Sequence, residues 1–187
     1  MTRRFRGGLE KRKPPARKAR CKGNAMREPL AYHISWTCYG QWLHGDRRGF
    51  VDRQHHTPGE PYIYDDPHRL NAAANRLAEP PCQLTDAQRR ATQEAIREAC
   101  AFRNWELSAV NAQPDHVHVV LRAPDHTGKQ VRSRLKDRAT RALKDANGRG
   151  RTHWWTEGGK VEPILDRRRL QQAVDYVSNR QPFPRVE

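Results

Sequence analysis

This chain has few cysteines, far fewer acidic than basic residues, and no long apolar run. Its cysteines form no C-x-x-C pair and no tight Cys/His cluster, which argues against a zinc finger or a disulfide framework. They are Cys21, Cys38, Cys82 and Cys100. No apolar run approaches the ~18 residues of a membrane span, and the N-terminus lacks the apolar core of a signal peptide. We therefore expect an intracellular, cytoplasmic protein with no membrane partner.

Positive charge is what the chain has in excess. Its 36 Lys and Arg against 21 Asp and Glu give a net charge of +15, which indicates a polyanionic partner or a basic tail. Residues 1–28 hold eleven of the basic residues and only Glu10 and Glu28, so +9 lies there and +6 in the remainder. With almost nothing apolar, this segment is predicted to be a disordered basic tail. It is either a solvated extension or a segment that holds phosphates non-specifically.

The remaining chain, 29–187, is predicted to be a single domain with a long insertion at about 40–81. A chain of 187 residues fits one domain on the usual prior of about 100–200 residues. The insertion is rich in glycine, proline and polar clusters, with at most one short helix near 68–77. Loops of this length in compact domains are usually functional or partly disordered.

The apolar pattern predicts strands and helices in the order βαββαβ, followed by one more helix. Strands are expected where apolar and polar residues alternate, and helices where apolar residues recur every three to four positions. The predicted strands are 30–39, 105–111, 116–122 and 153–156 with 161–165, and the predicted helices are 85–103, one ending near 147, and 166–180. The helix stripes are Ala87, Ala91, Ala95, Ala99 and Phe102 in the first and Val131, Leu135, Ala139 and Ala142 in the second. This order is typical of an α+β, ferredoxin-like antiparallel sheet with helices on one face and an additional C-terminal helix.

Two histidines separated by one valine, His116 and His118, stand in the third predicted strand. Successive strand residues point to opposite faces, so both imidazoles project the same way, roughly 7 Å apart at ~3.3 Å per residue. Val117, Val119 and Leu121 then face the core. Neutral imidazoles on a rigid strand are suited to a divalent metal, although the spacing alone equally fits histidines on a half-exposed strand.

Tyr176 lies on the last predicted helix, off its Leu170, Val174 and Val177 stripe and among polar residues. A tyrosine in such surroundings can attack phosphorus when a metal or a cation eases phenolate formation. Taken by itself, it fits an amphipathic tyrosine with a solvated hydroxyl better.

Taken together and in order, four motifs resemble those of the HUH single-tyrosine transposases. They are HVH, the basic helix after it, the WW pair at Trp154-Trp155, and AVDYVSNRQ. The closest resemblance is to the REP-associated tyrosine transposases and the IS200-like transposase group. YHISWTCYGQWLHGDRRGFV is similar to the opening strand and loop of that group, and REACAFRNWELSAVNAQPDHVHVVL to its central helix and hairpin. The resemblance covers about 29–181.

The resemblance implies that His116 and His118 bind Mg²⁺ or Mn²⁺ and that Tyr176 is the catalytic residue. Tyr176 would attack single-stranded DNA at a hairpin-associated site, forming a 5′-phosphotyrosine that a 3′-OH can later reverse. Such a protein would be nucleoid-associated, and many members work as homodimers while others are monomers.

A third ligand from the tyrosine helix is less clearly marked. Members commonly place Gln or Asn four residues after the tyrosine, where this chain has Arg180. We favour Gln181 as the metal ligand over Asn179, with Arg180 holding the scissile phosphate. A second departure is Gly158-Gly159-Lys160, where the group tends to carry a histidine-glycine-serine turn.

Six residues are expected to contact DNA. The resemblance assigns a phosphate contact to Lys136, and Arg132 and Arg134 lie on the same basic helix. Trp154 and Trp155, like Trp42, are suited to stack on unpaired bases, with core packing the alternative for each. The full set is Lys136, Arg132, Arg134, Arg180, Trp154 and Trp155.

Two other functions fit parts of the sequence. The same order of elements with basic and aromatic surfaces also suits a non-catalytic nucleic-acid-binding module. A hydrolase with zinc on His116 and His118 is weaker, because no general-base carboxylate has motif spacing to them.

Overall fold

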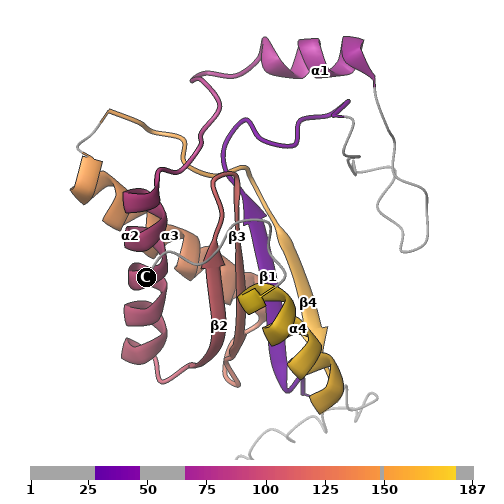
Figure 1. The fold of residues 1–187 in the computed structure, drawn as a ribbon, viewed down its shortest axis with the longest axis vertical. Helices are drawn as coiled ribbons and strands as arrows, with labels where there is room; N and C mark the ends of the chain where they lie inside the picture. Colours follow the sequence, from indigo (N-terminus) through magenta and orange to yellow (C-terminus); the bar gives the residue numbers. More distant parts are fainter. Residues whose placement is uncertain (1–27, 47–65, 148–149, 180–187) are drawn as a thin grey trace, which may run out of the picture.

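The computed structural model describes residues 28–46, 66–147 and 150–179, and its elements follow the predicted order (Figure 1). They are β1 (Ala31–Thr37), α1 (Pro67–Ala74), α2 (Asp86–Phe102), β2 (Glu106–Ala112), β3 (His116–Arg122), α3 (Gly128–Asn147), β4 (Lys160–Ile164) and α4 (Arg167–Asn179). The predicted basic tail, except Glu28, and the middle of the predicted insertion lie outside the described residues. No helix among the described residues is long and apolar enough to span a membrane.

The four strands form one sheet in the order β2-β3-β1-β4, and every neighbouring pair is antiparallel. This strand order confirms the predicted ferredoxin-like arrangement. It places β1 beside β3 at the centre, with Ser35 opposite His118 and Thr37 opposite His116. The polar side of β1 therefore adjoins the histidine pair.

The face away from the histidines is covered by α2 and α3. Val117, Val119 and Leu121 of β3 are fully buried there, in the same core cluster as Ile34 and Trp36 of β1. Because side chains alternate along a strand, this burial sends His116 and His118 to the opposite face, as predicted.

Helix α4 packs against that opposite face. Figure 1 shows it, in yellow, crossing in front of the sheet with α3 behind. Val177 is fully buried in a cluster with Val120 and Ile164 of the sheet, and half-buried Leu170 and Val174 pack around it. This packing is the predicted apolar stripe, and it holds the residues next to Val177 close to the histidines.

The predicted stripes are wrong at three helix positions. Phe102 is 84% exposed and Ala87 is exposed, whereas both were expected to face the core. Phe102 ends α2 beyond the sheet, where the Arg103 guanidinium lies over its ring. In α3, Leu143 rather than Ala142 continues the buried stripe. Alanine occurs on both exposed and buried helix surfaces, so the spacing of alanines alone does not identify the buried face of α2 or α3.

Candidate active site

His116 and His118 lie side by side on β3, and Tyr176 of α4 lies against them. The ring centroids of His116 and His118 are 4.8 Å apart, and the Tyr176 ring is 5.6 Å from that of His118. Tyr176 precedes the buried anchor Val177 but is itself 42% exposed. The predicted nucleophile and both predicted metal ligands therefore meet within one chain, at a place open to solvent.

His116 is held by the residue before it. Asp115 Oδ1 lies 2.6 Å from His116 Nδ1, and the indole N–H of Trp42 donates to the other carboxylate oxygen at 3.3 Å. The side chains of His116 and Asp115 are only 14% and 22% exposed. This contact fixes the orientation of the His116 ring.

A third histidine, which was not among the predicted site residues, joins the pair. His33 Nε2 lies 3.0 Å from His118 Nδ1, and the ring of His33 is 6.2 Å from that of Tyr176. On its other side, His33 Nδ1 lies 3.4 Å from Glu162 Oε2 of β4. Alternation in β1 indicated that His33 shares a face with Ser35, but its neighbours depend on the strand order.

The surroundings of His118 favour its neutral form. Burial, followed by the nearby His116 and His33, lowers the pKa of His118 to about 3. Burial also lowers the pKa of His33, although Glu162 opposes the shift. Neutral imidazole is the form that binds metal ions, so His118 is available as a ligand at neutral pH.

The third predicted ligand is not located. Asn179 is the last residue of α4 and is exposed, while Arg180 and Gln181 lie outside the described residues. In the part of the chain that the structure describes, no group of three or more His, Cys, Asp or Glu side chains is arranged to hold a metal ion. The choice of Gln181 stays a prediction.

Two predicted DNA contacts bind the loop before β4. Lys136 Nζ donates to the carbonyl oxygens of Thr156 and Gly158 at 2.6 and 3.0 Å, and the Arg132 guanidinium donates to the Gly159 carbonyl. Gly159 has φ of 129°, and a Cβ there would lie 2.6 Å from the Ser35 carbonyl oxygen. This crowding accounts for the second glycine of the Gly158-Gly159 turn.

Burial and charge distinguish the basic residues of α3. Burial, then the neighbouring Arg132, lowers the pKa of Lys136 to about 8. Arg134 is exposed. Lys136 therefore lies near its titration midpoint at mildly alkaline pH.

The three tryptophans differ in how far they are buried. Trp154 is 4% exposed in a core cluster with Cys82 and Leu143, so it packs inside and presents no face to a base. Trp155 is half-buried, and its indole N–H donates to Thr140 at 2.9 Å. Trp42 is 45% exposed beside His116, with a left-handed φ of 53°. Side-chain length and type did not distinguish these three positions in the sequence.

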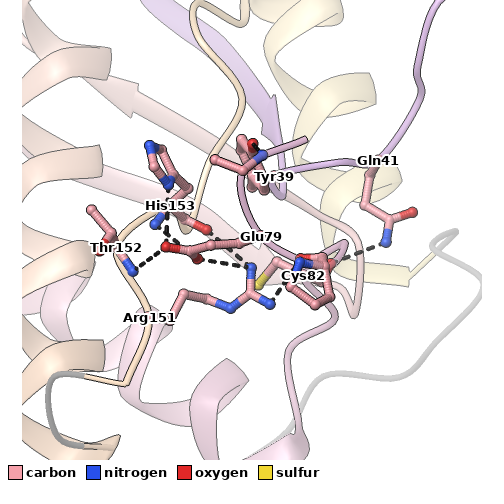
Figure 2. Close-up of polar contacts among 9 residues, drawn as sticks. Tyr39, Gln41, Glu79, Cys82, Arg151, Thr152 and His153 are labelled. Atoms are coloured by element: carbon pink, nitrogen blue, oxygen red, sulfur yellow. Dashed lines mark hydrogen bonds and ion pairs between the residues drawn. The ribbon is translucent and has the colours of Figure 1, made fainter. Parts of the chain in front are cut away.

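A polar cluster joins the end of the insertion to the segment before Trp154 (Figure 2). Glu79 accepts from the Thr152 and His153 N–H groups at 2.9 and 3.3 Å and lies 3.6 Å from the Arg151 guanidinium. Arg151 also donates to the Pro80 carbonyl at 2.9 Å. These contacts fix the two chain segments relative to each other.

The described residues thus place a β-strand histidine pair beside a helix-borne tyrosine on a ferredoxin-like sheet. Residues 82–180 match the profile of the family described as Transposase IS200 like. This match covers more than half of the chain, which therefore belongs to the IS200-like transposase family. A transposase family acts on DNA, so DNA is the partner class.

Two solved structures are similar to the chain. One is a REP-associated tyrosine transposase bound to a REP hairpin, with 13% identity, a TM-score of 0.48, and coverage of 86% of this chain and 70% of that one. The other is a proposed transposase from Deinococcus radiodurans R1, with 18% identity, a TM-score of 0.43, and coverage of 82% of this chain and 95% of that one. No curated protein sequence gives a significant match. The family assignment rests on the profile, and the fold on the strand order.

Proposed function

We propose that this chain is a metal-dependent endonuclease and strand transferase for single-stranded DNA, acting at a hairpin-associated site through a 5′-phosphotyrosine on Tyr176. The observation that carries the proposal is the contact between the Tyr176 ring and His118, with His116 alongside. Family membership supports DNA as the substrate class, and the tyrosine ring beside two imidazoles supports the assignment of a nucleophile and metal ligands.

The donor set suits Mg²⁺ or Mn²⁺ as the cofactor. His116 and His118 present imidazoles on one rigid strand, and the low pKa of His118 keeps its ring unprotonated at neutral pH. Imidazole binds divalent transition metals such as Mn²⁺, and Gln181 would add an oxygen, the donor that Mg²⁺ prefers. When bound there, the ion supplies Lewis-acid chemistry, polarising a phosphate oxygen and easing phenolate formation.

The reaction is one displacement at phosphorus. The Tyr176 oxygen forms a bond to phosphorus while the bond from phosphorus to the 3′ oxygen breaks, and the phenolic proton ends, in net terms, on that 3′ oxygen. The phosphotyrosine keeps the energy of the phosphodiester. Attack by another 3′-OH therefore reverses the step and joins strands with no nucleotide cofactor.

The basic residues hold the DNA backbone. Lys136, Arg132 and Arg134 line α3, and Arg180 follows the tyrosine helix in the sequence. Contacts of this kind supply affinity that falls with salt, whereas base contacts supply specificity. Among the tryptophans, Trp42 is best placed to stack on an unpaired base, because it is exposed next to His116.

A covalent-adduct assay tests the proposal. Wild type, Tyr176→Phe and Tyr32→Phe are mixed with labelled single-stranded hairpins from the repeats flanking the gene, with Mn²⁺, Mg²⁺ or EDTA, and run on a denaturing gel. Tyr32 is the matched control, because it lies on β1 and packs against the core on the other face. A metal-dependent adduct with wild type and Tyr32→Phe, but not with Tyr176→Phe, is expected. Tight binding with no adduct from any of the three would instead indicate a non-catalytic nucleic-acid-binding module.

A further inference from the structure

A histidine that binds a metal through one ring nitrogen usually donates the N–H of its other nitrogen to a neighbouring acceptor. That hydrogen bond fixes the tautomer and the ring orientation. His116 and His118 each have a close polar neighbour at Nδ1. A neighbour that can only accept a hydrogen bond determines which ring nitrogen carries the hydrogen.

The neighbour of His116 is a carboxylate. Asp115 Oδ1 lies 2.6 Å from His116 Nδ1, and an ionised carboxylate accepts hydrogen bonds but donates none. His116 Nδ1 therefore carries the hydrogen. In a neutral ring this leaves the lone pair on Nε2.

The neighbour of His118 is a second histidine, so its proton position depends on the next contact. His33 Nδ1 faces Glu162 Oε2 at 3.4 Å, and Lys160 Nζ holds the other Glu162 oxygen at 2.7 Å. Because Glu162 only accepts, His33 Nδ1 carries the hydrogen and His33 Nε2 accepts. His118 Nδ1 then donates across the 3.0 Å contact, and His118 Nε2 is left with the lone pair.

We propose that His33 and Glu162 are positioning residues that hold His118 in the Nδ1–H tautomer, with the lone pair of His118 Nε2 available to a metal ion. Three strands supply this chain of contacts: Glu162 from β4, His33 from β1 and His118 from β3. The order β3-β1-β4 in the sheet brings them together. The metal role of His118 rests on the proposed function, whereas the tautomer does not.

Two measurements test the proposal separately from DNA chemistry. The first is the ring-nitrogen NMR spectrum of protein labelled with ¹⁵N-histidine and free of metal, which distinguishes Nδ1–H from Nε2–H. Wild type is expected to show Nδ1–H at His118, and His33→Ala is expected to lose that preference. An Nε2–H tautomer at His118 in folded wild type would overturn the proposal.

The second measurement is Mn²⁺ affinity by titration calorimetry or by electron paramagnetic resonance. Loss of an outer hydrogen-bond partner typically weakens metal binding about 10–100-fold, and that is the loss expected for His33→Ala. His33→Gln, whose amide oxygen can accept from His118, is expected to recover part of the affinity. Ser35→Ala is the control, because Ser35 shares the same face of β1 and pairs with His118 in register.

Glu162→Ala keeps the test informative if His33→Ala fails to fold. Glu162 is 47% exposed, so its removal leaves the core untouched, and an intermediate loss of Mn²⁺ affinity is expected. Unchanged affinity in both folded His33 variants would overturn the proposal even if wild type forms the DNA adduct. If wild type forms no adduct while the tautomer and affinity results hold, the proposed function fails and this inference stands.

Discussion

At the scale of single residues, Lys136 combines a structural contact with a titratable charge. Its amine donates to two carbonyl oxygens, and burial followed by Arg132 lowers its pKa to about 8, from an ordinary value of 10.5. As the pH rises through 8, the folded protein loses this charge, whereas an arginine at the same position would keep it. A phosphate contact by Lys136 would therefore make DNA affinity depend on pH.

Replacing Lys136 by Arg is expected to remove that pH dependence. The quantity to compare is the slope of log affinity for single-stranded DNA against log salt concentration. From pH 7 to pH 9, the magnitude of this slope should decrease by about 0.7 in wild type, the value for one phosphate contact. In Lys136→Arg the slope should stay constant. The measurement is fluorescence anisotropy at several salt concentrations. Equal shrinkage in both proteins would remove Lys136 from the DNA contacts.

The same lowered pKa predicts the sign of a stability change. Between pH 8 and about 10.5 the unfolded chain binds a proton at Lys136 that the folded chain does not, so unfolding free energy rises with pH across that window. Lys136→Arg lacks this contribution. Urea unfolding at pH 7.5 and pH 9.5 should therefore show wild type gaining stability relative to the variant.

Two tryptophans should separate binding from stability. Trp42→Gly relieves the strain of a non-glycine residue with a left-handed φ and leaves the core intact, so the free energy of unfolding should change little. The affinity for single-stranded DNA should fall by ~1–3 kcal/mol, the value of one lost stacking contact. Trp154→Ala empties a buried position and should cost about 3–5 kcal/mol of stability. Chemical unfolding and anisotropy measure the two effects. A larger stability loss for Trp42→Gly than for Trp154→Ala would contradict the assignment.

At the scale of elements, the position of α4 determines where Tyr176 lies relative to the histidines of β3. Asn111, at the end of β2, is 1% exposed, and its amide donates to the Val177 carbonyl at 3.2 Å. The last carbonyls of a helix have no partner within the helix, so this bond secures the turn that carries Tyr176. Strand β2 thereby supports the proposed nucleophile.

Asn111→Ala is expected to loosen that turn. Removing one partner of a buried hydrogen bond costs about 1–3 kcal/mol, and amide exchange should quicken in the last turn of α4. Adduct formation should slow while Mn²⁺ affinity changes little, because the histidines on β3 are untouched. Gln171→Ala, an exposed change on the same helix, serves as the control. Unaltered adduct rates in a measurably destabilised Asn111→Ala would show that this anchor does not govern Tyr176.

Sequence predicted the elements well because their signals are local. The alternation through β3 is present as expected, and a local capping box of Thr85 and Gln88 marks the start of α2. His33 could not be assigned in this way, because its contact with His118 depends on strand order across 85 residues of chain, and Glu162 adjoins the site through His33. Base stacking and core packing could not be distinguished for Trp154 and Trp155 from the sequence, because burial depends on neighbouring elements rather than on residue type.

At the scale of the whole molecule, the chain brings Tyr176 to its own histidine pair. Only Leu165 and Asp166 separate β4 from α4, and the Val177 cluster seats the helix on its own sheet. Tyr176 therefore lies beside His118 of the same chain. In a homodimer that exchanged tyrosine helices, this contact would instead join two chains.

Mixing two inactive variants distinguishes these arrangements. His118→Ala keeps the tyrosine and Tyr176→Phe keeps the histidines, so exchange of helices between chains would restore an intact site in mixed dimers. Because the contact here lies within one chain, we expect adduct formation in the mixture to stay at the background of each variant alone. The control is wild type diluted with Tyr176→Phe, whose adduct yield should fall in simple proportion to the wild-type share. Recovery of a sizeable fraction of wild-type adduct in the variant mixture would show that α4 acts on the partner's sheet, and the short β4–α4 connection would then have to open to allow it.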